Sequence, residues 1–292
     1  MPISVAPLDA IGAEVSGIDF RNAPNGEDAA EIVAAIDQHA VLVFRHDAAL
    51  NDEQQTAFAA AFGPLQQLKM TKMLGKGKTR LNNPVLVDIS NLDENGNIFG
   101  ADDRRREFKM GNLTWHTDVS FADNRAVYSI LSARVIPPDG SGDTDFADMR
   151  GAYDALTDEK KAELNGLKAE HSVWHSRALG GMDDVSDKEK AIWPPAAHDL
   201  VHANPRTGRK CLYLASHASH IVGWTEDKGK ALLDELTDHA TQLQFTYTHK
   251  WRDGDVVMWD NLATMHRGTK YDDHTHVRDM RRTTVMERDM VE

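Results

Sequence analysis

The sequence contains little of what defines several large classes of protein. Cys211 is the single cysteine among 292 residues, so no disulfide can form within the chain. No apolar run approaches the roughly 18 residues of a membrane span. The start, MPISVAPLDA, lacks the basic region and apolar stretch of a signal peptide. We therefore expect a cytoplasmic protein with no membrane partner.

Positive charge is also in deficit, with 33 Lys and Arg against 46 Asp and Glu and a formal net charge of −13. Binding of nucleic acid depends on a basic surface, so we expect no nucleic acid partner. A small anionic ligand is still compatible with this balance, provided that a few arginines or lysines act locally inside a pocket. The apolar fraction of 41% is ordinary for globular proteins and argues against wholesale disorder.

Common cofactor and nucleophile signatures are absent as well. There is no GxGxxG and no GxxxxGK[ST], which removes the usual dinucleotide and P-loop fingerprints. There is no GxSxG elbow, and Cys211 lies in an apolar stretch, where a buried structural role is the simpler interpretation.

What the chain does contain is a long series of short strand-like segments separated by turn signals. This pattern favours a mainly β fold with flanking helices, a sandwich or jelly roll, over a doubly wound parallel sheet. We expect strands over 41–45, 113–118, 126–136, 143–147, 167–175, 199–203, 209–214, 244–249, 255–260 and 278–286.

Helical patterns occupy four places: 27–39, a segment from Asn51 to Gly63-Pro64, about 149–165, and 225–240. Asn51, followed by Gln54 three residues later, has the pattern of a capped helix start. We interpret residues 1–292 as one domain with a long excursion over 66–112.

A loop as long as 66–112 in a compact domain is usually functional, and we expect it to act as a lid. Lys69 and Lys72 within it are candidates to attract an anion, although solvated lysines are the simpler interpretation.

The 14 histidines make metal binding worth testing. In the predicted strand over 113–118, His116 and Asp118 alternate, and alternate residues of a strand point to the same face. Chance predicts about 14 × 46/292, or roughly two, His-x-acid pairs, and the sequence has one. The pair alone is therefore weak evidence.

A third ligand strengthens the case. An apolar strand ends at Trp259-Asp260-Asn261, and His266 follows it. Two histidines and one carboxylate on one face of an octahedron suit Fe(II) and leave three positions for substrate and oxygen. We take His266 as the third ligand.

Other histidine pairs are weaker candidates. His274 and His276 alternate, but in the polar stretch DDHTH, which is typical of a solvated loop. The remaining pairs are three or four residues apart in strand-like or loop segments, where that spacing does not bring the rings together: His171 with His175, and His217 with His220.

Arginines follow in the strand-like stretch RDMRRTTV (278–285). Alternation places Arg278 and Arg282 on one face and Arg281 on the other. Two guanidinium groups on a metal-bearing face are suited to hold two carboxylates in bidentate forks. A basic edge strand that discourages aggregation is an equally good interpretation of these residues alone.

The combination of WHTD, a distant MWDN…H and RxxxR resembles the TauD/TfdA superfamily of 2-oxoglutarate-dependent dioxygenases, and within it the members that act on aryloxyalkanoates. The resemblance covers most of the chain, through segments that include VLVFR…NDEQQTAFAAAFGPL (41–65), WHTDVSF (115–121), GDTDFADMRGAYDAL (142–156), LKAEHSVWHSR (167–177), TGRKCLYL (207–214) and VVMWDNLATMHRGTKYD (256–272).

This resemblance implies a double-stranded β-helix core and a set of site residues. It implies His116, Asp118 and His266 as iron ligands. For 2-oxoglutarate it implies Thr144 and Arg278 on the distal carboxylate, with Trp259 packed beside the co-substrate. For the substrate it implies Arg282 at the anionic group and Asn112 in the pocket lining.

The activity that the resemblance implies needs Fe(II), 2-oxoglutarate and O2. It hydroxylates a small anionic aromatic substrate, an aryloxyalkanoate, next to the ether oxygen. Alternatives keep this chemistry for a sulfonate, an alkyl sulfate or a natural aryl carboxylate. A non-catalytic jelly-roll binding protein is disfavoured by the complete ligand set and both arginines. We also expect a homo-oligomer.

Overall fold

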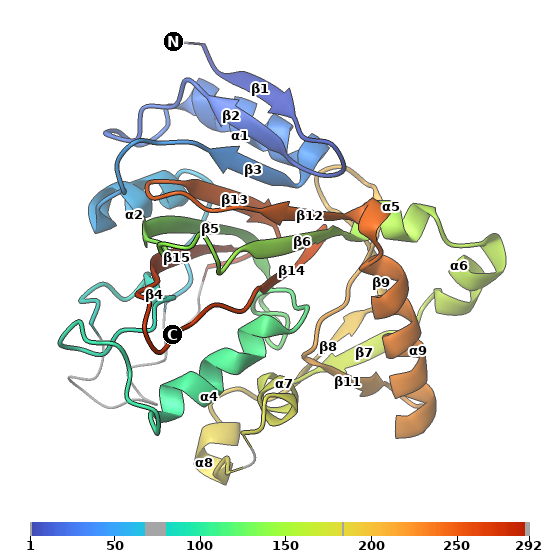
Figure 1. The fold of residues 1–292 in the computed structure, drawn as a ribbon. Helices are drawn as coiled ribbons and strands as arrows, with labels where there is room; N and C mark the ends of the chain where they lie inside the picture. Colours follow the sequence, from blue (N-terminus) through green and yellow to red (C-terminus); the bar gives the residue numbers. More distant parts are fainter. Residues whose placement is uncertain (1, 68–79, 183, 290–292) are drawn as a thin grey trace.

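The main structural feature is a seven-stranded sheet that runs through the centre of the molecule (Figure 1). The computed structural model describes residues 2–67, 80–182 and 184–289. Across the sheet the strands follow the order β1 (Ser4–Pro7), β2 (Ala13–Ser16), β3 (Val41–Phe44), β13 (Val256–Asp260), β5 (Ala126–Val135), β15 (Asp279–Met286) and β4 (Val87–Asp88). All neighbours in it are antiparallel except β2 and β3.

A second, three-stranded antiparallel sheet packs against the first (Figure 1). It contains β12 (Thr246–His249), β6 (Thr144–Asp148) and β14 (Thr264–Gly268), in that order. One apolar cluster joins the two sheets, with Phe146 and Met265 from the small sheet and Leu131, Val257 and Trp259 from the large one. The predicted mainly β architecture with flanking helices is therefore confirmed.

Smaller strands and most helices form a layer beyond the small sheet (Figure 1). The strands pair as β11 (Ala218–Ile221), β7 (Lys168–His171) and β8 (Ala196–Asp199), and as β10 (Lys210–Leu212) with β9 (Val201–Ala203). The helices here are α5 (Met149–Asp154), α6 (Asp158–Leu164), α7 (Val173–Leu179), α8 (Asp187–Lys190) and α9 (Glu226–Ala240), with η2 (Leu243–Phe245). Within the described part of the chain, no helix has the length and apolar character needed to cross a membrane.

Two capped helices pack against the large sheet. Helix α1 (Gly26–His39) begins at Asn25, whose side chain accepts from two backbone N–H groups. Helix α2 (Asp52–Ala60) begins with a complete capping box between Asn51 and Gln54, as the sequence predicted. Each side chain satisfies a backbone donor that the first helical turn would otherwise leave unpaired.

Several predicted boundaries are wrong. Residues 113–118 form no strand: the 3₁₀ helix η1 (Gly111–Leu113) is followed by irregular chain with a single β-bridge between His116 and His266. The predicted strand over 167–175 ends at His171, and α7 follows. The helix expected around 149–165 is two helices, α5 and α6, interrupted at Ala155–Thr157.

The predicted excursion over 66–112 contains structure of its own in its described part. Strand β4 joins the edge of the large sheet, and helix α4 (Arg104–Met110) precedes η1. Lys69 and Lys72 lie outside the described residues.

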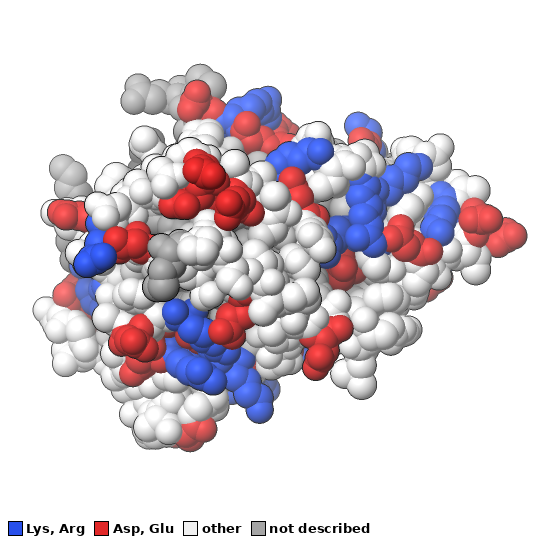
Figure 2. Space-filling model, turned by 90° about the horizontal axis from the view of Figure 1, so that it is seen from above, with Lys and Arg blue, Asp and Glu red and all other residues white. Residues whose placement is uncertain are grey.

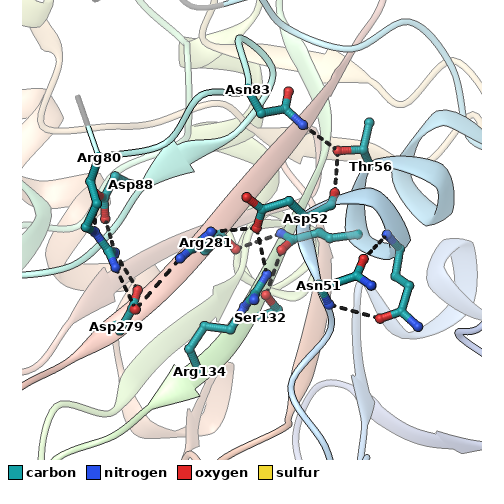
Figure 3. A network of polar contacts seen from close by, with 12 residues as sticks. Asn51, Asp52, Thr56, Arg80, Asn83, Asp88, Ser132, Arg134, Asp279 and Arg281 are labelled. Atoms are coloured by element: carbon teal, nitrogen blue, oxygen red, sulfur yellow. Dashed lines mark hydrogen bonds and ion pairs between the residues drawn. The ribbon is translucent and has the colours of Figure 1, made fainter. Parts of the chain in front are cut away.

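A charged network fastens this excursion and α2 to β15 (Figure 3). Arg80 donates to Asp279 at 2.6 Å and to Asp88 at 3.0 Å. Arg281 donates to Asp52 at 2.5 Å. The network lies on the face of β15 to which Arg281 points. The opposite face, which carries Arg282, is directed towards the interior.

We predict that Asn51→Ala lowers the free energy of unfolding by about 1 kcal/mol, because a backbone donor of α2 loses its capping oxygen. Chemical denaturation measures this change. Glu53→Gln is the matched control, since the exposed Glu53 side chain adjoins the same cap. Equal stability of wild type and Asn51→Ala would contradict the capping role.

Candidate active site

The three predicted metal ligands converge in the interior. One ligand atom each from His116, Asp118 and His266 lies within 4.8 Å of the other two, and all three residues are buried. The His116 and His266 backbones exchange two hydrogen bonds, N to O at 2.9 Å and 2.8 Å. This bridge ties the irregular segment before Asp118 to β14 and brings the imidazole rings to a centroid distance of 4.2 Å.

The convergence has a different cause from the one that the sequence suggested. His116 and Asp118 do not alternate along a strand, because Asp118 begins a turn. The next residue, Val119, has φ of 56°, a left-handed conformation that is unfavourable for a β-branched residue. Such strained positions cluster at functional sites, and this one lies directly beside a candidate ligand.

The imidazoles are held in defined orientations. Nδ1 of His116 lies 2.8 Å from the Thr114 carbonyl oxygen, so Nδ1 carries the proton and Nε2 is left to bind a metal. The His266 ring packs against Trp259, with centroids 4.7 Å apart, and against Phe146 at 6.1 Å. Its Nδ1 is buried without a hydrogen-bond partner among the described residues.

Donors from the large sheet surround the Asp118 carboxylate. Ser129 Oγ on β5 donates to Oδ2 at 2.7 Å, and Arg282 on β15 donates to Oδ1. Asn261 donates to Ser129 Oγ at 3.0 Å and accepts from Trp259 Nε1 at 3.0 Å. Trp259 therefore helps to position Asp118 through this chain of hydrogen bonds.

The electrostatics suit a divalent cation. Burial favours the neutral form of Asp118, but the charge of Arg282 and the hydrogen bond from Ser129 favour the ionised form, and the pKa of this carboxyl is lowered to about 2. Burial lowers the pKa of His116 and holds the pKa of His266 well below its usual value. An ionised carboxylate and two neutral imidazoles are the donor forms that a metal requires, and this donor set fits Fe(II).

The residues predicted to hold 2-oxoglutarate meet beside Gly142. Arg278 is buried and donates from Nε to the Gly142 carbonyl oxygen at 3.1 Å. Thr144, two residues further on, is also buried and accepts from Trp251 Nε1 at 3.0 Å. Gly142 has φ of 82°, and a Cβ there would lie 3.1 Å from Arg278 Nε, so a side chain at this position would displace the guanidinium.

A cavity of about 190 Å³ opens beside the metal ligands, between the β4–β15 edge and helices α4 and α7. Arg282 and Asn112, the two residues predicted to contact substrate, both line it. Its other walls include Val87, Ile89, Phe108, Lys109, Val119, Phe121, Val173, Arg177, Trp193, His217 and Met286. A cavity of about 150 Å³ accommodates a benzene ring, so this one has the size for a single aromatic group.

Comparisons with known proteins agree with this geometry. The family model described as Taurine catabolism dioxygenase TauD, TfdA family matches residues 4–284. The chain belongs to this family. The alpha-ketoglutarate-dependent 2,4-dichlorophenoxyacetate dioxygenase of Cupriavidus pinatubonensis is 42% identical over 283 residues, which cover 96% of each chain. The (S)-phenoxypropionate/alpha-ketoglutarate-dioxygenase of Sphingobium herbicidovorans is 36% identical and covers 92% of this chain and 90% of its own.

A solved structure is also similar to this chain along almost its whole length. The crystal structure of AAD-2 in complex with Mn(II) and N-oxalylglycine has a TM-score of 0.93 and 44% identity, with 99% of each chain covered. The resemblance seen in the sequence is confirmed, and this protein is a 2-oxoglutarate-dependent dioxygenase of the TauD/TfdA family.

Sequence reasoning missed several pocket residues of this dioxygenase. Arg177 lies two residues beyond the segment 167–175 that was predicted as strand; it belongs to helix α7 and lines the pocket. Trp193 lies in a stretch with no strong secondary-structure signal and meets Phe121 at a centroid distance of 6.0 Å. Arg177 ends the family-like segment LKAEHSVWHSR, but the resemblance gave this arginine no role, and Trp193 has no motif around it.

We predict that Ser129→Ala weakens Mn(II) binding by about 10- to 100-fold, because the Asp118 carboxylate loses an orienting donor. Ser132→Ala is the matched control. Ser132 is also buried on β5, but its hydroxyl donates to Gln55 at 2.7 Å, away from the ligands, so Mn(II) affinity is retained.

Titration calorimetry with Mn(II) measures the affinity of each serine variant. Asp118→Ala, which lacks one of the three candidate ligands, serves as the variant without an intact metal site. Unchanged affinity in Ser129→Ala would show that Asp118 needs no orientation from β5.

Proposed function

We propose that this chain is an Fe(II)- and 2-oxoglutarate-dependent dioxygenase that hydroxylates an aryloxyalkanoate on the carbon next to the ether oxygen. The observation that carries the proposal is the His116–Asp118–His266 cluster at the base of an arginine-containing pocket with an aromatic wall. The names of the relatives at 42% and 36% identity support the same substrate class.

His116, Asp118 and His266 hold the iron, with the orientations described above. Fe(II) in such a site supplies the activation of O2, which is coupled to 2-oxoglutarate decarboxylation. The protein contributes neutral imidazoles, an ionised carboxylate, and an enclosed position for the substrate carbon. Enclosure matters because an oxidant formed without a positioned substrate reacts unproductively.

Arg278 and Thr144 bind the distal carboxylate of 2-oxoglutarate, and Trp259 packs beside it. Burial lowers the pKa of Arg278 to about 10, so the guanidinium stays charged at neutral pH. Within the described residues the one hydrogen bond from its side chain goes to a carbonyl oxygen. A buried, charged guanidinium with few hydrogen-bond partners is stabilised when a carboxylate pairs with it.

The substrate occupies the cavity beside the ligands, with its ring among the apolar side chains and its carboxylate near Arg282 and Asn112. The reaction takes an aryloxyacetate, 2-oxoglutarate and O2 to the 2-hydroxylated acid, succinate and CO2. That product is a hemiacetal, and it separates into a phenol and glyoxylate as the ether oxygen takes up the hydroxyl proton.

Three further features, the core architecture, the location and the oligomeric state, complete the proposal. The two packed sheets form a double-stranded β-helix core, and the protein acts in the cytoplasm as a homo-oligomer. These are proposals that rest on the family and on the composition of the chain.

We predict that Arg278→Ala raises KM for 2-oxoglutarate by about 30-fold or more while KM for the aryloxyacetate changes far less. The reason is the loss of a charged partner, which costs roughly 2–5 kcal/mol. Steady-state succinate formation measures both constants.

Arg281→Ala is the control for this experiment, because Arg281 pairs with Asp52 on the opposite face of β15. It should leave both KM values near wild type. A variant of Arg278 with normal affinity for 2-oxoglutarate would remove this residue from the co-substrate site.

We also predict the labelling pattern under ¹⁸O2 gas. The phenol carries no label, because the ether oxygen leaves with the ring, and succinate gains one labelled oxygen. Mass spectrometry of phenol, glyoxylate and succinate tests this. Release of sulfite and an aldehyde from a sulfonate, with no phenol from any aryloxyalkanoate, would instead identify the alternative substrate class.

A further inference from the structure

Two guanidinium groups line the pocket, and their surroundings differ. Arg282 is paired with the Asp118 carboxylate. Arg177 is 7% exposed, yet in the described part of the chain its side chain makes no hydrogen bond and no ion pair, and its Nε is buried without a partner. A buried charge without a counter-ion is costly, so this arrangement needs an explanation.

Packing, rather than hydrogen bonding, holds Arg177 in place. Its guanidinium lies over the Phe108 ring of α4, 4.2 Å from the centroid. On another side it lies against the backbone of Gly111, where an added Cβ would be 1.8 Å from Nη1. Stacking and steric contact of this kind fix a guanidinium while its N–H donors stay available.

Arg177 also lies close to the reacting centre. It lines the same cavity as the candidate ligands His116 and Asp118 and as His217. Burial lowers the pKa of Arg177 to about 10, so the side chain is still charged at neutral pH. The protein as a whole is acidic, with a net charge of −13, but this pocket is locally positive.

The pocket walls beside Arg177 are apolar and aromatic. The ring centroids of Phe121 and Trp193 lie 6.0 Å apart, and those of Trp193 and Trp174 lie 5.7 Å apart. Val173, one turn before Arg177 on α7, lines the same cavity. An aromatic wall next to an unpaired guanidinium is complementary to an aromatic acid.

We propose that Arg177 is a substrate-binding residue, which holds the carboxylate of the aryloxyalkanoate together with Arg282 and selects acids over neutral aryl ethers. The inference rests on the proposed function for the identity of the ligand. Bidentate binding by Arg177 supplies the counter-ion that the protein itself does not provide, and it fixes the ether-side carbon beside the metal ligands.

The test measures binding and turnover separately. Binding of 2,4-dichlorophenoxyacetate and of its neutral amide is measured by calorimetry on protein loaded with Mn(II) and N-oxalylglycine. Turnover of the acid is measured with Fe(II) and 2-oxoglutarate. We expect Arg177→Met to weaken binding of the acid by about 30-fold or more, with binding of the amide and KM for 2-oxoglutarate within about threefold of wild type.

Two further variants keep the result interpretable. Gly111→Ala retains the charge but pushes the guanidinium aside, so it should also weaken binding of the acid, even where Arg177→Met folds poorly. Arg104→Gln is the matched control, because Arg104 lies on the same α4 helix as Phe108 but is exposed and paired with Glu189 at 2.8 Å. It should bind the acid like wild type.

The outcomes separate the two proposals. Normal binding of the acid by Arg177→Met or by Gly111→Ala overturns the role of Arg177 and leaves the proposed function standing. Binding of the acid that depends on Arg177, without any phenol from wild type, supports the role and overturns the proposed reaction. Wild type that neither binds nor converts the acid overturns both.

Discussion

The buried carboxylate of Asp118 sets most of the constraints on this site. It is 3% exposed, and an ionised group at that depth is stable only with compensating charge and hydrogen bonds. Two strands of the large sheet supply them, through Ser129 on β5 and Arg282 on β15, and Asn261, just after β13, donates to Ser129 Oγ. The chemistry of the site therefore depends on the register of the sheet.

The pairing of β5 with β13 and β15 shows how strict this dependence is. Ser129 faces Trp259 on one side and Thr284 on the other, and Arg282 faces Leu131. A slip of one residue in β15 would turn Arg282 away from Asp118 and bring Arg281 inward. The outer network of Arg281 with Asp52, and of Asp279 with Arg80 (Figure 3), opposes that slip.

Charge is distributed differently on the surface and in the interior. On the face seen in Figure 2, groups of basic side chains lie next to acidic ones. Inside, Arg177, Arg278 and Arg282 are all largely buried, at different depths, around the candidate metal centre. An acidic protein with a positive interior pocket can select small anions, because only a ligand that enters the pocket reaches the low-dielectric positive region.

Features that depend on neighbours in the chain were predictable from the sequence alone. The capping box of Asn51 and Gln54, helix α9, and most strands of the two sheets follow from local spacing and turn residues. The three ligand candidates, and the opposite directions of Arg281 and Arg282, followed from short motifs. These patterns can be recognised in a sequence because backbone geometry imposes a period of two residues on strands and of 3.6 residues on helices.

Contacts between distant segments were decided only by the tertiary structure. Residues 113–118 look like a strand but are held by one bridge to His266, and β14 itself was not predicted, because its five residues become a strand only when β6 pairs with them. Trp193 carried no motif, and the family-like segment that ends at Arg177 gave this arginine no role. Their place in the pocket depends on what packs around them, which involves several segments that lie far apart in the sequence.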